Sequence, residues 1–394
     1  MTPRKPDQEL LLRGHTGRVF LLVTLAYLAI KTGQRLLPPL LPFIVDDFGI
    51  TSFVAGIALS VMAVVRAVLQ FPSGRFSDGL SRATILFVAF SLGILGFTLL
   101  VATPTYPVFL ASVCVLGSAI GLFDPAARAL ISDLFHEKRG RAFGLHTLAG
   151  DLAGIVAAGM AVALTARTWR TAFVPSIGVL IPALFVFKLW SREAVVFEWI
   201  TMDVRETVSR LSRVSRLRWA LLAYSFTVFA SIGVTSFLPT FLVSVHDFPV
   251  DVAGGAFALL YGVGIVVKPI SGWLSDCVPR LAIVGGGTLL ASISLLSLVL
   301  APSFATAIAA VVCYAVGQRA FPPPFNAYLM DRFPDDSMGG DLGAMRTVYL
   351  GFGSLGPAYV GFVADNFGYD VAFASIVFFF LGAATITLWL IPSR

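Results

Sequence analysis

Residues 74–82 read GRFSDGLSR, and residues 272–280 read GWLSDCVPR. The two stretches share glycine, serine, aspartate and arginine at matching positions, 198 residues apart. The same offset relates Asp133 to Asp331, each at the end of an apolar segment. These matches indicate that the chain is an internal duplication.

The composition of the chain indicates a membrane protein. Of its 394 residues, 57% are hydrophobic and only 13% are charged, and the mean hydropathy is +0.87. A soluble domain carries about 25% charged residues. So few charges cannot cover a globular surface, and lipid must therefore replace water around much of the chain.

The apolar segments predict an all-α polytopic protein with twelve transmembrane helices in two pseudo-symmetric bundles of six. The predicted spans are 17–44, 53–73, 83–103, 107–133, 141–165, 170–190, 218–244, 253–272, 281–301, 304–330, 343–365 and 370–391. Residues 1–190 form one bundle and residues 218–394 the other. The polar linker 191–217 repeats apolar residues at helical spacing between arginines, which predicts an amphipathic helix at the anionic inner leaflet. A surface for a regulatory partner is the alternative.

Basic residues predict the orientation. Twenty of the 28 Lys and Arg, among them Arg332 and Arg346, fall on the linker side of the predicted spans, and only Arg167 and Arg170 fall on the other. By the positive-inside rule, both termini and the linker are cytoplasmic and the protein lies in the cell membrane. This distribution explains the net charge of +6 through membrane lipids and without nucleic acid.

The chain shows no pattern typical of an enzyme. The three cysteines, Cys114, Cys277 and Cys313, are odd in number and lack metal-ligand spacing, so we expect neither a disulfide nor a metal site. A Walker loop, a nucleophile elbow and an HExxH motif are all missing from the sequence, and we expect no cofactor.

The repeated loop, a Gly with Asp four residues on and Arg four further, resembles the signature of the major facilitator superfamily. Gly150 and Gly154, followed by Ala158-Gly159, are similar to the glycine-rich fifth helix of that family, although Ile155 replaces the proline of its motif. One family motif is missing, since Val113 stands where an arginine precedes Gly117 in proton-driven drug antiporters.

The resemblance implies a monomeric secondary transporter that works by rocker-type alternating access, driven by ion or substrate gradients. Glycines in the repeated loops allow close helix approach, and charges beside them can bias a two-state element. We therefore expect a conformational latch in each half, with a static helix-end cap as the alternative. Its residues are Gly74, Asp78, Arg82 and Asp133, repeated as Gly272, Asp276, Arg280 and Asp331.

Six basic residues remain inside the predicted spans: Lys31, Arg35, Arg66, Arg128, Lys268 and Arg319. Each costs about 2.5–3.5 kcal/mol at a helix centre, so each requires water, a partner or a ligand. Asp124 and Asp151 are the acidic residues placed well inside. An anion would correct this imbalance, and arginine forks suit carboxylate, nitrate or phosphate.

These positions define the predicted substrate site, with neutral polar side chains added. Its residues are Arg35, Arg319, Lys31, Arg66, Lys268, Gln34, Gln318, Asn326 and Tyr261. Asp124 and Asp151 are candidates for coupling to H⁺ or Na⁺, because burial raises the pKa of a carboxylate. Structural alternatives are an i,i+4 pair of Arg128 with Asp124 and a Lys268 side chain that snorkels to the surface.

Three functional hypotheses follow. The first is a transporter of a small anion, foremost an organic carboxylate, with nitrate and phosphate esters as close alternatives. The second is a proton-coupled multidrug or cationic-solute exporter, which the excess of buried positive charge disfavours. The third is a sensor or scaffold that kept the fold without transport, which the two intact repeated loops disfavour.

Overall fold

The computed structural model describes residues 11–79, 81–164, 168–190, 215–332 and 338–391. Nearly all of these residues are helical, and the described ranges contain no strand. Twelve helical spans in them are long and apolar enough to cross a membrane. The predicted fold class is confirmed, and the chain is a multi-pass membrane protein.

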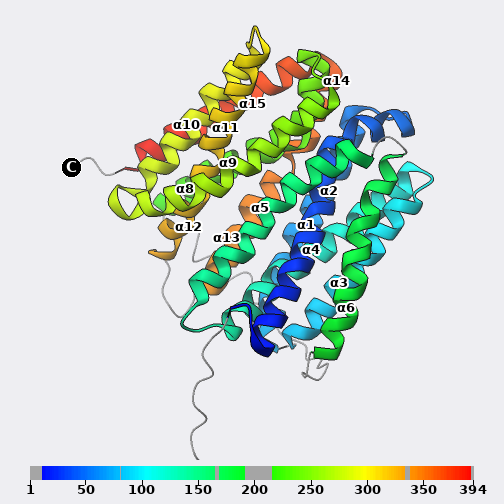
Figure 1. The fold of residues 1–394 in the computed structure, drawn as a ribbon. Coiled ribbons are helices and arrows are strands. Elements are labelled where there is room, and N and C mark those ends of the chain that lie inside the picture. The colour runs from blue at the N-terminus through cyan, green and yellow to red at the C-terminus, as the bar shows by residue number, and fades with distance from the viewer. Residues whose placement is uncertain (1–10, 80, 165–167, 191–214, 333–337, 392–394) are drawn as a thin grey trace, which may run out of the picture.

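The helices before the linker form the first half of the molecule, coloured blue to green in Figure 1. They are α1 (Gly14–Phe48), α2 (Ser52–Gly79), α3 (Arg82–Ala102), α4 (Tyr106–Leu134), α5 (Arg139–Leu164), the short 3₁₀ helix η1 (Trp169–Phe173) and α6 (Val174–Trp190).

The helices after the linker form the second half, in which two spans are interrupted. They are α8 (Ser215–His246), α9 (Val250–Cys277), α10 (Arg280–Val299), α11 (Phe304–Ala320), α12 (Pro322–Met330), α13 (Met338–Gly353), α14 (Gly356–Phe367) and α15 (Tyr369–Trp389). The consecutive prolines at 322–324 end α11, because proline lacks an amide hydrogen and clashes with the preceding turn. The break falls at Phe321, between the last residue of α11 and the first of α12.

Helix ends follow from local chemistry. Ser81 caps α3 by accepting a hydrogen bond from the Thr84 amide, and Ser303 forms a capping box with Thr306 at the start of α11. Gly49 ends α1 in the left-handed conformation, with φ of 59°, which a residue without Cβ adopts at little cost. The chain therefore turns sharply between α1 and α2.

The outer surface of the molecule is apolar, as lipid requires. Phe185, Leu189, Phe378 and Trp389 each expose more than 60% of their surface. Fully buried phenylalanines such as Phe237 and Phe241 fill the interior instead. The exposed apolar side chains have no favourable solvent other than hydrocarbon.

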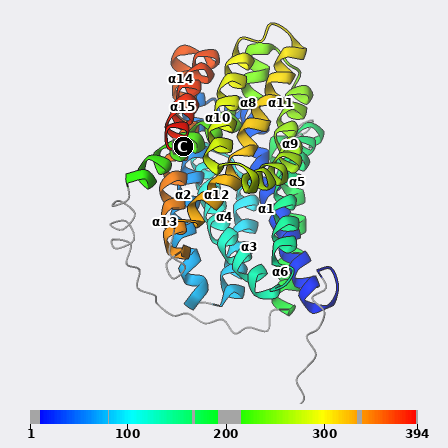
Figure 2. The same cartoon turned by 90° about the vertical axis from the view of Figure 1, so that its left-hand side faces the viewer.

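Helices of the two halves pack against one another in symmetry-related pairs. α2 lies against α13 and α14, and α5 lies against α9, as the turned view in Figure 2 shows from the side. Spans two and five of the first half thus meet spans eleven and eight of the second. Helices α1 and α8 also meet between these pairs.

The end of the molecule where α1 meets α2, called here the α1–α2 end, carries polar contacts between the halves. The amides of Ser52 and Phe53 donate to the Asp365 carboxylate at 3.0 and 2.7 Å. The amide of Ala358 on α14 donates to Ser60 Oγ on α2 at 3.0 Å. These contacts join α2 to α14 across the two halves.

The predicted amphipathic helix of the linker lies outside the described residues, which resume with α8 at Ser215. The opposite end of the molecule from the α1–α2 end, where α6 stops and α8 begins, is called the linker end below.

Candidate functional site

A cavity of about 310 Å³ lies between the two halves. Helices α1, α2 and α4 line it from the first half, and α8, α9, α11 and α13 line it from the second. Its lining contains the carboxylate of Asp124 and six basic side chains: Lys31, Arg35, Arg66, Arg128, Arg319 and Arg346.

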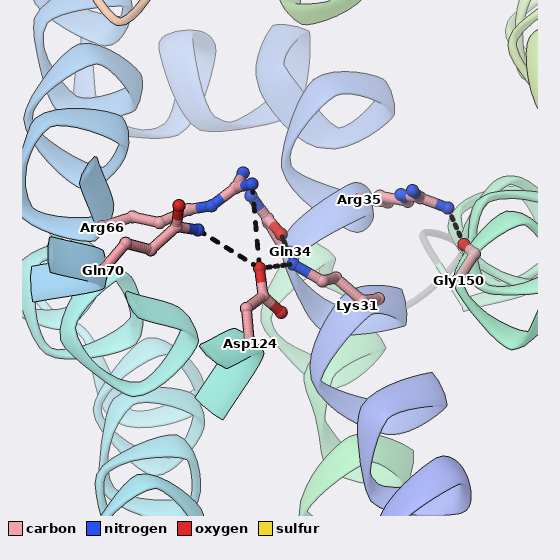
Figure 3. A network of polar contacts seen from close by, with 7 residues as sticks. All are labelled: Lys31, Gln34, Arg35, Arg66, Gln70, Asp124 and Gly150. Atoms are coloured by element: carbon pink, nitrogen blue, oxygen red, sulfur yellow. Dashed lines mark hydrogen bonds and ion pairs between the residues drawn. The ribbon is translucent and has the colours of Figure 1, made fainter. Parts of the chain in front are cut away.

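Asp124 is the centre of a buried charge network drawn in Figure 3. Its Oδ2 accepts a hydrogen bond from Lys31 Nζ at 3.1 Å and another from Gln70 Nε2 at 3.4 Å. Arg66 Nη2 lies 3.8 Å from the same oxygen. The side chains of Lys31 and Asp124 are only 5% and 6% exposed. The single carboxylate of the cavity is thus shared among cations of α1 and α2.

Two arginines from opposite halves meet at Tyr261 on α9. The guanidinium carbon of Arg35 lies 4.2 Å from the centre of the Tyr261 ring, and that of Arg319 lies 4.5 Å from it. Arg35 also donates to the carbonyl oxygen of Gly150 on α5, and Arg319 donates to that of Leu260 at 3.0 Å. Backbone oxygens and an aromatic face therefore hold both guanidinium groups without neutralising them.

Arg128 and Arg346 form a second pair from opposite halves. Both line the cavity, Arg128 from α4 and Arg346 from α13. The Arg346 Nε is buried without a hydrogen-bond partner among the described residues. Within the same ranges, neither arginine forms an ion pair with a carboxylate.

An ion pair between the halves lies beside the cavity. Lys268 Nζ on α9 contacts both carboxylate oxygens of Asp151 on α5, at 2.7 and 2.6 Å. The Asp151 side chain is 3% exposed and that of Lys268 is 23% exposed. This pair directly links α5 of the first half to α9 of the second.

The structure gathers most of the predicted substrate residues around the cavity. Its lining includes Lys31, Gln34, Arg35, Arg66, Tyr261, Gln318 and Arg319. Lys268 and Asn326 do not line it: Lys268 pairs with Asp151, and Asn326 lies on α12 beyond the proline break. Asp124, a predicted coupling residue, lines the cavity, whereas Asp151 does not.

The structure corrects the sequence-based placement of Arg346. It was expected among the basic residues of the linker side, yet it lines the cavity, because α13 begins at Met338 and carries Arg346 about 12 Å into the helix. The i,i+4 pair of Arg128 with Asp124, an alternative in the sequence analysis, is not among the ion pairs of the described residues, where Asp124 faces Lys31 and Arg66. The one feature of the sequence that could have indicated a place in the cavity for Arg346 was its position near the start of the predicted span 343–365.

The repeated loops place equivalent ion pairs at the linker end. Arg82 pairs with Asp133 and donates to the Ala129 carbonyl oxygen at 3.1 Å. In the second half, Arg280 pairs with Asp331 and donates to the Ala327 carbonyl oxygen at 2.9 Å. The Arg280 guanidinium holds the pKa of the Asp331 carboxyl below its usual range.

These ion pairs use four of the eight predicted latch residues. Asp276 is exposed and attracts Arg280 electrostatically. The side chains of Gly74 and Asp78 lie outside the described part of the chain. The latch role of the eight residues remains a prediction.

Comparison with known proteins identifies the family. The family model of the Major Facilitator Superfamily matches residues 20–357 and, in a second match, residues 269–394. The chain belongs to the Major Facilitator Superfamily, and it is a secondary transporter, not an enzyme. A comparison with curated protein sequences found no match.

Solved structures share the fold at low sequence identity. A bacterial homologue of the human lysosomal transporter Spinster, inward-facing and unoccupied, has a TM-score of 0.82 and 17% identity, over 96% of this chain and 97% of its own. A POT family transporter in complex with 5-aminolevulinic acid has a TM-score of 0.81 and 13% identity, over 98% and 99%. The E. coli fucose:proton symporter has a TM-score of 0.65 and 16% identity, over 96% and 100%.

Proposed function

We propose that this transporter moves a small anion, foremost an organic carboxylate, across the cell membrane. One observation carries the proposal: six basic side chains and a single carboxylate line the cavity between the halves. Uncompensated charge of one sign is costly inside a membrane protein. A bound anion supplies the missing negative charge, and arginine provides forked donors that match a carboxylate.

The anion binds beside the Tyr261 ring, between Arg35 of the first half and Arg319 of the second. Both guanidinium groups lie over that ring and retain N–H donors beyond those that bind the carbonyl oxygens of Gly150 and Leu260. Because both halves contact the ligand, its binding affects the position of each half relative to the other, as alternating access requires. The halves then rock around the bound anion, with the linker end facing the cytoplasm.

We assign the coupling of transport to an ion to Asp151. Its pair with Lys268 connects the halves directly, whereas the contacts of Asp124 stay within the first half. Protonation of Asp151 would remove the negative charge that attracts Lys268 and so weaken the contact between α5 and α9. We favour H⁺ over Na⁺ as the coupling ion, because the similar structures include a fucose:proton symporter and a D-xylose-proton symporter.

The contacts of the two acidic residues disfavour the alternative function, a cationic-solute exporter. Asp124 contacts Lys31 and Arg66, and Asp151 contacts Lys268. A cationic substrate would have to compete with these basic side chains and enter a cavity of net positive charge. Coulomb repulsion in a partly desolvated cavity opposes such binding.

The test is a thermal-stability screen of the purified protein against organic carboxylates, nitrate, phosphate and lipophilic cations. A ligand that binds the folded protein raises its Tm by mass action. We expect a carboxylate to raise the Tm, and we expect Arg319→Gln to weaken its binding by about tenfold, since a charge-assisted hydrogen bond contributes about 1.5–3 kcal/mol.

The matched control is Arg18→Gln, which removes an exposed arginine of α1 that does not line the cavity. This variant should bind the carboxylate as the unmodified protein does. Stabilisation by lipophilic cations alone, unchanged by Arg319→Gln, would exclude the anion proposal and favour the exporter.

A further inference from the structure

We propose that Arg128 and Arg346 form a second anion subsite in the cavity, so that the substrate carries two acidic groups, as a dicarboxylate does. This inference rests on the proposed anion transport and narrows its substrate class. It starts from like charges gathered in one place: Arg128 and Arg346, from opposite halves, line the same cavity, and neither forms an ion pair with a carboxylate among the described residues.

Each of the other four basic residues of the cavity has a carboxylate or an aromatic ring beside it. Lys31 and Arg66 face the Asp124 carboxylate, and Arg35 and Arg319 lie over the Tyr261 ring. Arg128 is exposed to the cavity, and Arg346 keeps a buried Nε without a partner among the described residues.

Helix geometry separates this pair from the one at Tyr261. The contact between Lys31 and Asp124 sets α1 and α4 at the same level. From this level, Arg35 lies four residues nearer the α1–α2 end, and Arg128 lies four residues nearer the linker end. Each step is about 6 Å along a helix, so the two backbone positions are about 12 Å apart along the bundle.

Side-chain direction does not change that separation. In an α-helix side chains lean toward the N-terminus of the helix. Lys31 and Arg35 lean alike along α1, and Asp124 and Arg128 lean alike along α4, so the level set by the contact between Lys31 and Asp124 already includes this lean. The guanidinium groups of Arg35 and Arg128 are therefore also about 12 Å apart along the bundle.

The chemistry of both subsites suits a carboxylate. Each pairs an arginine of the first half with one of the second, Arg35 with Arg319 and Arg128 with Arg346. An elongated dianion can place one acidic group at each pair, and the second group removes the repulsion between Arg128 and Arg346. A monocarboxylate would leave that repulsion in place, so the cavity should prefer the dianion.

The experiment compares a series of dicarboxylates with monocarboxylates of matched chain length, measured as Kd from Tm shifts of the full-length protein. We expect the best dicarboxylate to bind at least about tenfold tighter than its matched monocarboxylate. In Arg346→Gln and in Arg128→Gln this ratio should fall to about one. Arg18→Gln should preserve it.

A charge-conserving variant separates contact from long-range attraction. Arg346→Lys keeps the positive charge but loses the planar fork, so the ratio should stay several-fold below that of the unmodified protein. Two results would overturn the second subsite alone. The first is an Arg346→Lys variant with the same preference for dicarboxylates as the unmodified protein. The second is an unmodified protein that binds monocarboxylates and dicarboxylates equally well. If no anion of either series raises the Tm, the proposed anion transport fails with it.

Discussion

At the scale of single residues, Asp124 shows how this protein keeps charges inside the membrane. Its carboxylate contacts Lys31 and Arg66 and accepts a hydrogen bond from Gln70. Burying ions costs several kcal/mol each, and mutual attraction offsets that cost only while every partner is present. One carboxylate thus stabilises two of the six basic side chains of the cavity and leaves four for other contacts.

Removal of this carboxylate should destabilise the fold. We expect Asp124→Asn to reduce the free energy of unfolding by about 3 kcal/mol, because Lys31 and Arg66 lose their counter-charge in a buried site. The measurement is the Tm in detergent without ligand. The double variant Lys31→Met/Asp124→Leu should recover most of the loss, since it removes both members of the closest pair. An unchanged Tm in Asp124→Asn would contradict the central role of this carboxylate.

At the scale of helices, close packing places the charged side chains. A Cβ at Gly117 on α4 would lie 2.5 Å from the Met62 carbonyl oxygen on α2, and one at Gly121 would lie 2.9 Å from that of Arg66. Glycine at both positions lets the two helices approach backbone to backbone. The contact between Arg66 and Asp124 depends on this approach.

A larger residue at Gly117 should therefore separate α2 from α4. We expect Gly117→Val to destabilise the protein by about 1–3 kcal/mol, as overpacking does in well-packed interiors. The matched control is Gly178→Val on α6, where a Cβ would meet nothing within 4 Å. Tm measured for both variants checks the prediction, and an equal loss in the two would show that the α2–α4 approach is not the cause.

At the scale of the whole molecule, the two halves meet through α2 with α14 and through α5 with α9. Alternating access requires the contacts at the α1–α2 end to open and re-form in each cycle. The hydrogen bond from the Ala358 amide to Ser60 Oγ, 3.0 Å long, brings the two backbones close about two turns into α2 from that end.

A crosslink at this position should stop transport. In a background without Cys114, Cys277 and Cys313, we expect the pair Ser60→Cys and Ala358→Cys to form a disulfide on oxidation, since the backbones lie within reach of one. Transport in proteoliposomes should fall to background and return on reduction. Each single cysteine variant is the control, and full transport by the crosslinked protein would contradict movement at this end.

The sequence by itself determined the membrane location, the twelve spans and the family, because hydropathy and the repeated loops depend on local order along the chain. The break at Phe321 likewise follows from three consecutive prolines, whose effect on a helix is local. Seven of the nine predicted substrate residues line the cavity, since charged and polar side chains inside an apolar span are costly to expose to lipid.

Only the tertiary structure decided which charges pair. Asp124 pairs with Lys31, which is 93 residues away in the sequence, and Asp151 pairs with Lys268, which is 117 residues away. Arg346 entered the cavity because α13 begins earlier than the apolar pattern indicated. Such pairings depend on how the two halves dock and on which face each helix turns inward, and neither is encoded in the spacing of residues along one helix.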